Sequence, residues 1–252
     1  MSLSVIMPVN NGEEYLAAAI QSALDLGQPQ LELIVVDNGS TDRTAQIAAR
    51  YSAHVRYIYQ DDRGPAGGRN VGLRVAQSEI VGFLDADDLW TAGINNLFRL
   101  LMEEPEIEIA QGYIREIHET KSNGTEVSST PYAFLNLGSA LYRRSVFAKI
   151  GGFDESLWGC EDYDWYLRAF ESRITKRRIP EVTLLYRIHP GSLTYGKGIA
   201  EIGLAAAQKK AIERRRRGIA VAPPADFPTL ADYIGGRQPA ATLSGAAAES
   251  GG

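Results

Sequence analysis

Three carboxylates stand within four residues, at Asp85, Asp87 and Asp88, directly after the apolar segment 81–84. Like charges placed this closely repel one another, and apolar surroundings raise the free energy of their ionised forms. A divalent cation would offset both effects, because Mg²⁺ and Mn²⁺ prefer oxygen ligands and share their coordination sphere with substrate phosphates. The cluster therefore predicts a metal site that binds a phosphorylated ligand. The coordination geometry of this site does not follow from the sequence, since a turn at a strand end can redirect either Asp85 or Asp87.

Two further polar segments stand at the ends of apolar runs. Residues 8–11 end the first run, and Asp37 and Asn38 end the second. The carboxyl ends of parallel strands meet at one edge of a sheet, where ligands bind. A single aspartate at a strand end is more often a turn residue or a helix cap. Three polar ends on one edge instead favour a shared binding site.

Apolar runs and helical periodicities alternate through the N-terminal part of the chain. This alternation predicts an α/β fold, with a mostly parallel sheet flanked by helices on both faces. Strands are expected at 3–9, 31–37, 54–60 and 79–85, with helices at 13–24, 43–51 and 67–77. Ser40 or Thr41 is the expected cap of the second helix, and Thr91 is the expected cap of the helix at 94–101. The following part is less regular, with strands expected within 107–119, 137–143 and 179–189 and helices at 94–101, 144–150 and 160–171.

The C-terminal part has a different composition. Residues 199–218 end in "KKAIERRRRG" and predict a helical extension with a basic end. Residues 219–252 predict a flexible tail, because they are rich in residues that build little core. A basic helix end is usually solvated, but these arginines could also make a peripheral contact with anionic lipids.

The overall charge limits the classes of partner. The chain has 252 residues, of which 26 are basic and 31 acidic, giving a formal net charge of -5. This charge argues against nucleic-acid binding through a broadly basic surface, so any bound phosphate must be held locally. Cys160 is the only cysteine, and no apolar run approaches the roughly 18 residues of a membrane-spanning helix. The expected location is cytoplasmic, with any membrane contact peripheral at the inner face.

Two classes of nucleotide-binding enzyme lack their sequence signatures. A dinucleotide-dependent oxidoreductase needs a glycine fingerprint between the first strand and the first helix, but "PVNNGEEYL" has a single glycine. The GxxxxGK segment of a P-loop nucleotidase does not occur in the sequence. Both classes are therefore disfavoured.

A second acidic group, Glu161 and Asp162 in "GCEDYDW", follows the turn "GGFDE". A carboxylate is a competent general base when its surroundings bring its pKa toward the operating pH. Acidic residues also stabilise the first turn of a helix, which is the alternative interpretation of this segment. Trp158 could stack on a sugar or belong to the core. His189 could be a metal ligand or a structural residue.

The order of these segments resembles that of the family 2 glycosyltransferases, which have the GT-A fold. The resemblance runs from "SVIMPVNN" through "ELIVVDNGSTDRT", "GPAGGRNVGL" and "VGFLDADD" to "GGFDESLWGCEDYDWYLR" and "YRIHPGSLT". Several motifs in this order are far more specific than any single one. The resemblance implies a Rossmann-like GT-A domain at 1–198, with a nucleotide-sugar-binding half at 1–90 and an acceptor-binding half at 91–198.

The resemblance also implies how the donor would be held. Pro8 and Asn10 would line the nucleotide pocket, and Asp37 would hydrogen-bond the uracil ring of a UDP-sugar. Arg69 would approach the nucleotide or its phosphates. The segment Asp85–Ala86–Asp87 matches the DxD motif of the family, which binds the ribose, the sugar and the metal.

Metal and catalytic roles follow from the same resemblance. Asp87, Asp85 and His189 would hold Mn²⁺ or Mg²⁺ against the diphosphate. Asp162 matches the position of the general base, with Glu161 as the close alternative, in an inverting enzyme that uses one displacement. The reaction would transfer a hexosyl or N-acetylhexosaminyl group to a saccharide, lipid-linked or other hydroxyl acceptor.

One position departs from the family pattern. Family members often have two aspartates where this chain has Asp37 and Asn38, so the choice of uracil is less secure, although asparagine also suits a turn. Two alternative functions remain. A nucleotidyltransferase acting on a sugar phosphate would release pyrophosphate. A catalytically inactive nucleotide-sugar-binding protein would not need to retain both "DADD" and "ED".

Overall fold

The computed structural model of the protein describes residues 2–119, 125–127, 130–192, 195, 203–219 and 229–234. The strands are β1 (Leu3–Val9), β2 (Leu31–Asn38), β3 (Val55–Gln60), β4 (Ile80–Phe83), β5 (Leu89–Trp90), β6 (Ile109–Glu119), β7 (Thr125–Val127), β8 (Ala140–Arg143) and β9 (Lys176–Ile188). The helices are α1 (Leu16–Leu24), α2 (Thr44–Arg50), α3 (Gly64–Val75), α4 (Gly93–Glu103), the 3₁₀ turn η1 (Leu137–Ser139), α5 (Arg144–Ile150), α6 (Glu161–Glu171), α7 (Leu204–Arg216) and α8 (Leu230–Ile234).

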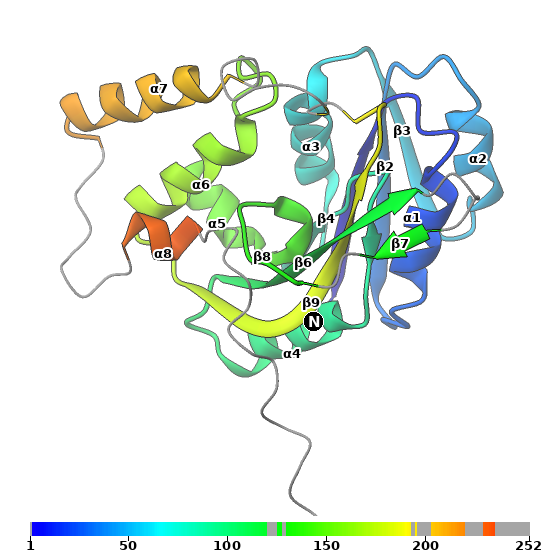
Figure 1. Ribbon diagram of the computed structural model, residues 1–252, viewed down its shortest axis with the longest axis horizontal. Coiled ribbons are helices and arrows are strands. Elements are labelled where there is room, and N and C mark those ends of the chain that lie inside the picture. Colours follow the sequence, from blue (N-terminus) through cyan, green and yellow to red (C-terminus); the bar gives the residue numbers. More distant parts are fainter. Residues whose placement is uncertain are drawn as a thin grey trace, which may run out of the picture.

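The strands form one mixed sheet in the order β3-β2-β1-β4-β8-β6-β9-β5, and β7 pairs with β6 (Figure 1). Strands β3, β2, β1 and β4 are mutually parallel, as the sequence predicts. Beyond β4 the pairing alternates, because β8 is antiparallel to both β4 and β6 whereas β9 is parallel to β6. The predicted GT-A type of α/β fold is therefore confirmed, with its four consecutive parallel strands in the N-terminal half.

Both faces of the parallel strands are covered by helices. Along β1, Val5 and Met7 belong to a core with α1, α2 and α4, whereas Ile6 belongs to a second core with α3, α5 and α6 (Figure 1). Successive side chains of a strand point to opposite faces, so burial on both faces requires continuous apolar runs. This requirement explains why these strands were recognisable in the sequence.

Helix α3 lies unusually close to the sheet because it is rich in glycine. A Cβ atom at Gly72 would stand 2.2 Å from Cγ2 of Ile6, and one at Gly68 would stand 2.7 Å from Nδ2 of Asn38. Side chains at these positions would push the helix outward. The close approach places the beginning of α3 directly beside the ends of β1 and β2.

Two helix starts differ in how well they were predicted. The Oγ1 atom of Thr91 accepts a hydrogen bond from the Gly93 amide at 3.1 Å, which confirms the expected cap of α4. At α2 the prediction of Ser40 or Thr41 is wrong, because Oδ1 of Asp42 accepts from the Thr44 amide at 2.9 Å. Helix α3 begins at Gly64, three residues before the expected start at 67.

The C-terminal part contains two helices. Helix α7 lies within the segment expected to be a basic helix, of which residues 199–202 fall outside the described residues. Within the segment expected to be a flexible tail, α8 packs against α6, and Tyr233 is only 2% exposed. Nζ of Lys176 donates a hydrogen bond to the Tyr233 carbonyl. The prediction therefore does not hold for α8, and residues 220–228 and 235–252 fall outside the described residues.

None of the helices in the described ranges combines the length and the apolar character that crossing a bilayer requires.

Candidate active site

The loops after β1 and β2 are tied to each other at the carboxyl edge of the sheet. The Asn11 amide donates to Oγ of Ser40 at 2.8 Å, and the Thr41 amide donates to Oδ1 of Asn11 at 2.9 Å. Asn11 has a φ of 52°, a left-handed conformation that asparagine tolerates better than most residues. The predicted convergence of these two strand ends is present, and it forms one wall of the candidate site.

Asp37 lies at the end of β2 and is 1% exposed. Its Oδ1 accepts from the Ser40 amide at 2.8 Å, and its Oδ2 accepts from the Tyr57 hydroxyl at 2.6 Å. Burial and the neighbouring Asp37 carboxylate raise the pKa of Tyr57, so this hydroxyl keeps its proton and remains a donor. These two donors fix the orientation of the Asp37 carboxylate. Tyr57, which was not among the predicted site residues, comes from the neighbouring strand β3.

Asn38 is 3% exposed and points beneath the beginning of α3. Its Nδ2 donates to the Gly64 carbonyl at 2.9 Å, and its Oδ1 accepts from Nε2 of Gln60. Its own carbonyl accepts from Nδ2 of Asn10 at 2.6 Å. A carboxylate cannot donate to the Gly64 carbonyl. The hydrogen bond to Gly64 therefore explains why position 38 has an asparagine and not an aspartate. The turn-forming role considered from the sequence is therefore not what the side chain does.

Pro8 is buried in β1, where a Cβ on Gly68 of α3 would stand 3.1 Å from the proline Cβ. Ala86 is also buried, and it lies near Gly12 at the beginning of the first loop. Asn10, in contrast, is exposed. Of the predicted nucleotide-lining residues in this wall, Asn10 is thus the one with an exposed side chain.

Arg69 connects the two acidic clusters. It is 6% exposed, and it donates from Nη2 to Oδ1 of Asp85 at 2.7 Å and from Nη1 to Oε1 of Glu161 at 2.5 Å. Burial would lower the pKa of Arg69, but Asp85, Glu161 and Asp162 together raise it, so the residue is a permanent cation. The resemblance implies that Arg69 approaches the nucleotide or its phosphates. In the structure, two of its nitrogens bind the carboxylates of Asp85 and Glu161 instead.

Asp87 and Asp88 have partners on the end of β9. Oδ2 of Asp87 lies 3.1 Å from Nε2 of His189. Oδ1 of Asp88 accepts from the Arg187 amide at 2.8 Å, and Nε of Arg187 donates to the Asp87 carbonyl at 2.8 Å. Burial, followed by the charge of Asp85, raises the pKa of Asp87, and the contact with His189 opposes this rise. Burial and both neighbouring aspartates raise the pKa of Asp88 well above its usual range.

The crowded carboxylates therefore have separate protein partners, namely Arg69 for Asp85, His189 for Asp87 and the Arg187 amide for Asp88. A cation was expected to offset their crowding, and each of the three carboxylates also has a partner within the protein. No three His, Cys, Asp or Glu side chains converge into a metal-binding group among the described residues. The adjacent carboxylate and imidazole still fit a Mg²⁺ or Mn²⁺ ion that takes its other ligands from water and phosphate.

Glu161 and Asp162 occupy the first turn of α6, which also agrees with the helix-stabilising interpretation. Oδ1 of Asp162 accepts from the Tyr163 amide at 2.6 Å, and within the described ranges Asp162 forms no ion pair. Burial and the charge of Glu161 raise the pKa of Asp162 to about 7, although Arg69 opposes the rise. A half-buried carboxylate of this kind can exchange a proton near neutral pH.

Trp158 is 55% exposed, which rules out a core position for its ring. The ring lies against Gly64 at the beginning of α3, where an added Cβ would stand 2.9 Å from Cζ3 of the tryptophan. Cys160, in contrast, is buried. An exposed indole four residues before Asp162 gives this part of the site a flat apolar surface, which suits the face of a sugar ring.

Comparisons with known proteins identify the family. A family model described as "Glycosyl transferase family 2" matches residues 4–151 of the chain. The chain belongs to glycosyltransferase family 2. A related model, "Glycosyltransferase like family 2", matches residues 121–212. The resemblance seen in the sequence is therefore confirmed at the level of the family.

Family 2 relatives and solved structures agree with this assignment. The uncharacterized glycosyltransferase EpsJ of Bacillus subtilis is 28% identical over 218 residues, which are 76% of this chain and 62% of EpsJ. The putative teichuronic acid biosynthesis glycosyltransferase TuaG of Bacillus subtilis is 40% identical over 93 residues, 35% of this chain and 36% of TuaG. This chain therefore spans less than two thirds of the length of these relatives.

Two solved structures resemble the fold. S. aureus TarS 1–349 in complex with UDP-GlcNAc has a TM-score of 0.68 at 21% identity, covering 84% of this chain and 65% of that one. The mannosyltransferase PcManGT from Pyrobaculum calidifontis, in complex with GDP-Man and Mn²⁺, has a TM-score of 0.67 at 20% identity, covering 92% of this chain and 67% of that one. These likenesses show that the chain shares its fold with TarS and PcManGT.

Proposed function

We propose that the protein is an inverting glycosyltransferase that moves a sugar from a nucleotide-sugar to an acceptor hydroxyl, with Asp162 as the general base. Family membership supports the reaction class. The observation that carries the choice of base is the environment of Asp162, whose raised pKa and lack of an ion-pair partner within the described ranges distinguish it from Glu161, which is paired with Arg69.

The residues have distinct roles in the proposed reaction. Asp162 accepts the proton of the acceptor hydroxyl as the hydroxyl oxygen attacks the anomeric carbon. The bond to the donor diphosphate breaks on the opposite side, and its electron pair leaves with the diphosphate, so the product has inverted configuration. Arg69 holds Asp85 and Glu161 in place and thereby fixes the donor side relative to the base. Trp158 offers its exposed face to the acceptor.

We further propose that the donor is a UDP-sugar whose uracil binds beside Asp37. The fixed carboxylate of Asp37 can accept a hydrogen bond from the imide N–H of uracil. Guanine also has an N–H group suited to a carboxylate, and PcManGT was solved with GDP-Man. Calorimetry with UDP, GDP, CDP and ADP tests the choice. UDP should bind most tightly and Asp37→Ala should reduce that preference, whereas equal affinities would contradict it.

A divalent cation, Mn²⁺ or Mg²⁺, would be held by Asp87 and His189, with Asp85 nearby. When bound, it would neutralise the charge on the departing diphosphate. The contact between a carboxylate and an imidazole at 3.1 Å supports this assignment. Asp87→Ala should abolish turnover and leave the fold intact, because the side chain is one third exposed, at 33%. Full turnover by this variant, or in excess chelator, would contradict the metal role.

The overall proposal is tested by incubating the protein with a panel of nucleotide-sugars, Mn²⁺ and candidate acceptors. Hexosyl and N-acetylhexosaminyl donors are the first choices, with saccharide and lipid-linked hydroxyls as acceptors. Nucleotide diphosphate should appear together with a glycoside of inverted configuration, read by NMR. Pyrophosphate release would instead indicate a nucleotidyltransferase. Binding without turnover would indicate an inactive nucleotide-sugar-binding protein.

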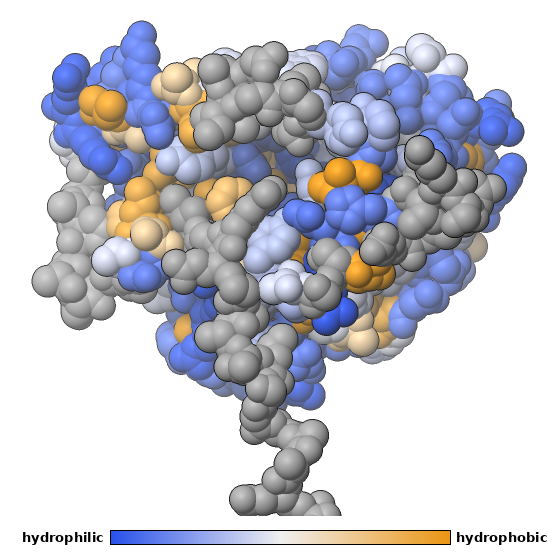
Figure 2. All heavy atoms as spheres, in the orientation of Figure 1, coloured by the Kyte–Doolittle hydropathy of each residue, from blue (hydrophilic) through white to orange (hydrophobic). Residues whose placement is uncertain are grey.

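We also propose a cytoplasmic location with a peripheral membrane contact through the outward face of α7. Arg216, Arg217 and Ile219 are exposed there, and the described surface at this end is largely hydrophilic with scattered hydrophobic residues (Figure 2). Basic residues beside exposed apolar ones suit the surface of an anionic bilayer. In a flotation experiment, the protein should rise with vesicles that contain anionic lipid. The double variant Arg216→Glu with Arg217→Glu should stay at the bottom of the gradient.

A further inference from the structure

Helix α7 is attached to the helix that carries Asp162 by ion pairs on its inner face. Arg214 donates from Nη1 to Oδ1 of Asp164 at 2.7 Å and from Nε to Oε2 of Glu171 at 2.8 Å. Nε of Arg215 lies 3.3 Å from Oε1 of Glu171. Both carboxylates are almost fully buried, with side-chain exposures of 2% and 6%. Part of the basic end of this helix therefore neutralises buried acids of α6.

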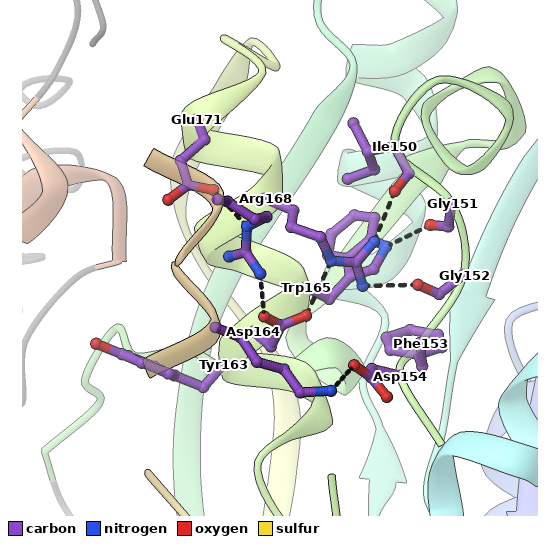
Figure 3. Close-up of polar contacts among 12 residues, drawn as sticks. Ile150, Gly151, Gly152, Phe153, Asp154, Tyr163, Asp164, Trp165, Arg168 and Glu171 are labelled. Atoms are coloured by element: carbon purple, nitrogen blue, oxygen red, sulfur yellow. Dashed lines mark hydrogen bonds and ion pairs between the residues drawn. The ribbon is translucent and has the colours of Figure 1, made fainter. Parts of the chain in front are cut away.

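Asp164 lies two residues after Asp162 and is a central point of this network (Figure 3). Its Oδ2 accepts from Nε of Arg168 at 2.9 Å, while Arg168 donates to the carbonyls of Ile150 at 2.6 Å and Gly152 at 2.7 Å. The same carboxylate thus links α7, the first turn of α6 and the turn at 150–152. Breaking such a buried ion pair leaves an uncompensated charge, which is strongly unfavourable.

Lys210 makes a second attachment, to the segment that precedes α6. Its Nζ contacts Oδ2 of Asp154 and donates to Oγ of Ser156 at 2.7 Å. Apolar contacts continue the attachment, because Ala207 of α7 packs with Leu157 and Cys160. Helix α7 therefore follows the segment 154–160 up to the residue before Glu161.

An open groove borders the beginning of this segment. It has a volume of about 1010 Å³, and its lining includes Asn70, Phe153, Asp154, Asp164, Arg168 and Arg214. Asp154 and Asp164, which Lys210 and Arg214 bind, therefore lie at the edge of open space rather than within a packed core. Asn70 of α3 holds one end, through a hydrogen bond to the Phe153 carbonyl at 2.9 Å. On the α7 side, support comes from Lys210 and Arg214.

We propose that Lys210 and Arg214 are positioning residues for the transfer reaction, which hold the segment 154–162 so that Trp158 and Asp162 face the acceptor. The two residues do not touch the reacting groups. Lys210 acts through Asp154, the first residue of that segment, and Arg214 acts through Asp164, two residues after its end. This inference rests on the proposed function for its effect on turnover, but its effect on the segment itself can be measured separately.

The test compares inner-face with outer-face variants of α7 in the full chain. Lys210→Ala and Arg214→Ala remove the contacts, while Lys209→Ala removes an exposed cation of the same helix. Hydrogen exchange of the amides at 153–163 should rise in the inner-face pair alone. Transfer turnover should fall about 10- to 100-fold in that pair, as expected for a displaced catalytic group, while UDP affinity changes less than about twofold.

A charge exchange provides a rescue. The Lys210 and Asp154 side chains are 35% and 31% exposed, so Asp154→Lys with Lys210→Asp should fold and restore most of the slow exchange and turnover that either single change removes. Because Lys210 is partly exposed, its variants stay informative even if Arg214→Ala does not fold.

Two outcomes would overturn the inference. One is unchanged exchange at 153–163 in Lys210→Ala, and the other is faster exchange with unchanged turnover. A wild-type protein that transfers no sugar would instead contradict the proposed function. In that case the exchange comparison would still show whether α7 holds the segment.

Discussion

The two acidic clusters have the same sequence pattern but different partners. Each places three carboxylates in four residues, as Asp85, Asp87 and Asp88 in one cluster and Glu161, Asp162 and Asp164 in the other. In the first cluster, every carboxylate contacts a side chain or an amide from another element. In the second, the partner of Asp162 among the described residues is the amide of the next residue.

This difference shows that carboxylate spacing alone does not assign roles. Glu161 and Asp164 pair with cations, Arg69 in one case and Arg168 with Arg214 in the other. Asp162, between them, has its pKa raised and forms no ion pair with any residue that the structure describes. The proton-accepting role that we propose thus belongs to the carboxylate without an ion pair among these residues. Four changes test this contrast.

The largest effect is expected for Asp162→Asn. The amide keeps nearly the same shape but cannot accept the acceptor proton, so transfer should fall about 10²- to 10⁴-fold. Donor affinity, measured by calorimetry, should stay almost unchanged. Glu161→Gln is the control, and its main effect should be on stability, because Glu161 pairs with the buried Arg69. A fully active Asp162→Asn enzyme would remove the distinction between the two carboxylates.

Arg69→Met should break the connection between the clusters. Methionine fills similar space but leaves the buried Glu161 carboxylate without its cation, so the free energy of unfolding should fall by about 3–5 kcal/mol in chemical denaturation. Equal stability of wild type and variant at neutral pH would show that the connection is unimportant.

A smaller effect is expected for Asn38→Asp, which restores the second aspartate often seen in the family. The new carboxylate would face the Gly64 carbonyl at the position of the present donor, which lies at 2.9 Å. The free energy of unfolding should fall by about 1–3 kcal/mol, the usual effect of leaving a buried group unsatisfied. An unchanged denaturation midpoint would mean that position 38 is structurally neutral.

The pH dependence of the wild type gives the most graded test. Asp162 must be ionised to act as a base, and its pKa is about 7, so transfer should fall about tenfold for each pH unit below 7 and level off above it. The free energy of unfolding should change in the opposite direction. Between about pH 4 and 7 the native state keeps the Asp162 proton, whereas the unfolded chain, with a pKa of 3.8, has lost it. The free energy of unfolding should therefore fall as the pH rises through this range. Asp162→Asn should abolish both trends.

The parallel half of the fold was predictable because its signals are local. Strands β1, β2 and β4 are apolar runs, and their polar ends meet wherever parallel strands share an edge. The antiparallel insertion of β8 between β4 and β6 has no such local signal. Helix α8 was missed because five residues are too few to show a periodicity. Its position depends instead on Tyr233 filling space beside Phe170.

The candidate residues were predictable, but their pairings were not. Asp37, Asp85 and Asp87 stand where sequence patterns placed them. The partnership of Arg69 with Glu161 joins residues 92 positions apart, and nothing in either segment indicates the other. Tyr57 was missed because β3 has no regular alternation of buried and exposed residues that would single it out. The partners of Asp87 and Asp88 required knowing that β9 ends beside the first loops.

The long sequence separations within the site have a consequence for how the protein is made. The contact of Asp87 with His189 spans 102 residues, whereas that of Asn10 with Asn38 spans 28. Loop closure costs more entropy for distant segments, so local pairings form first. During synthesis, β1 to β4 can therefore assemble before α6 and β9 exist, leaving Arg69 without Glu161. We expect an incomplete nascent chain to expose this arginine to chaperones, and pulse-labelled hydrogen exchange should show β1 protected before α6.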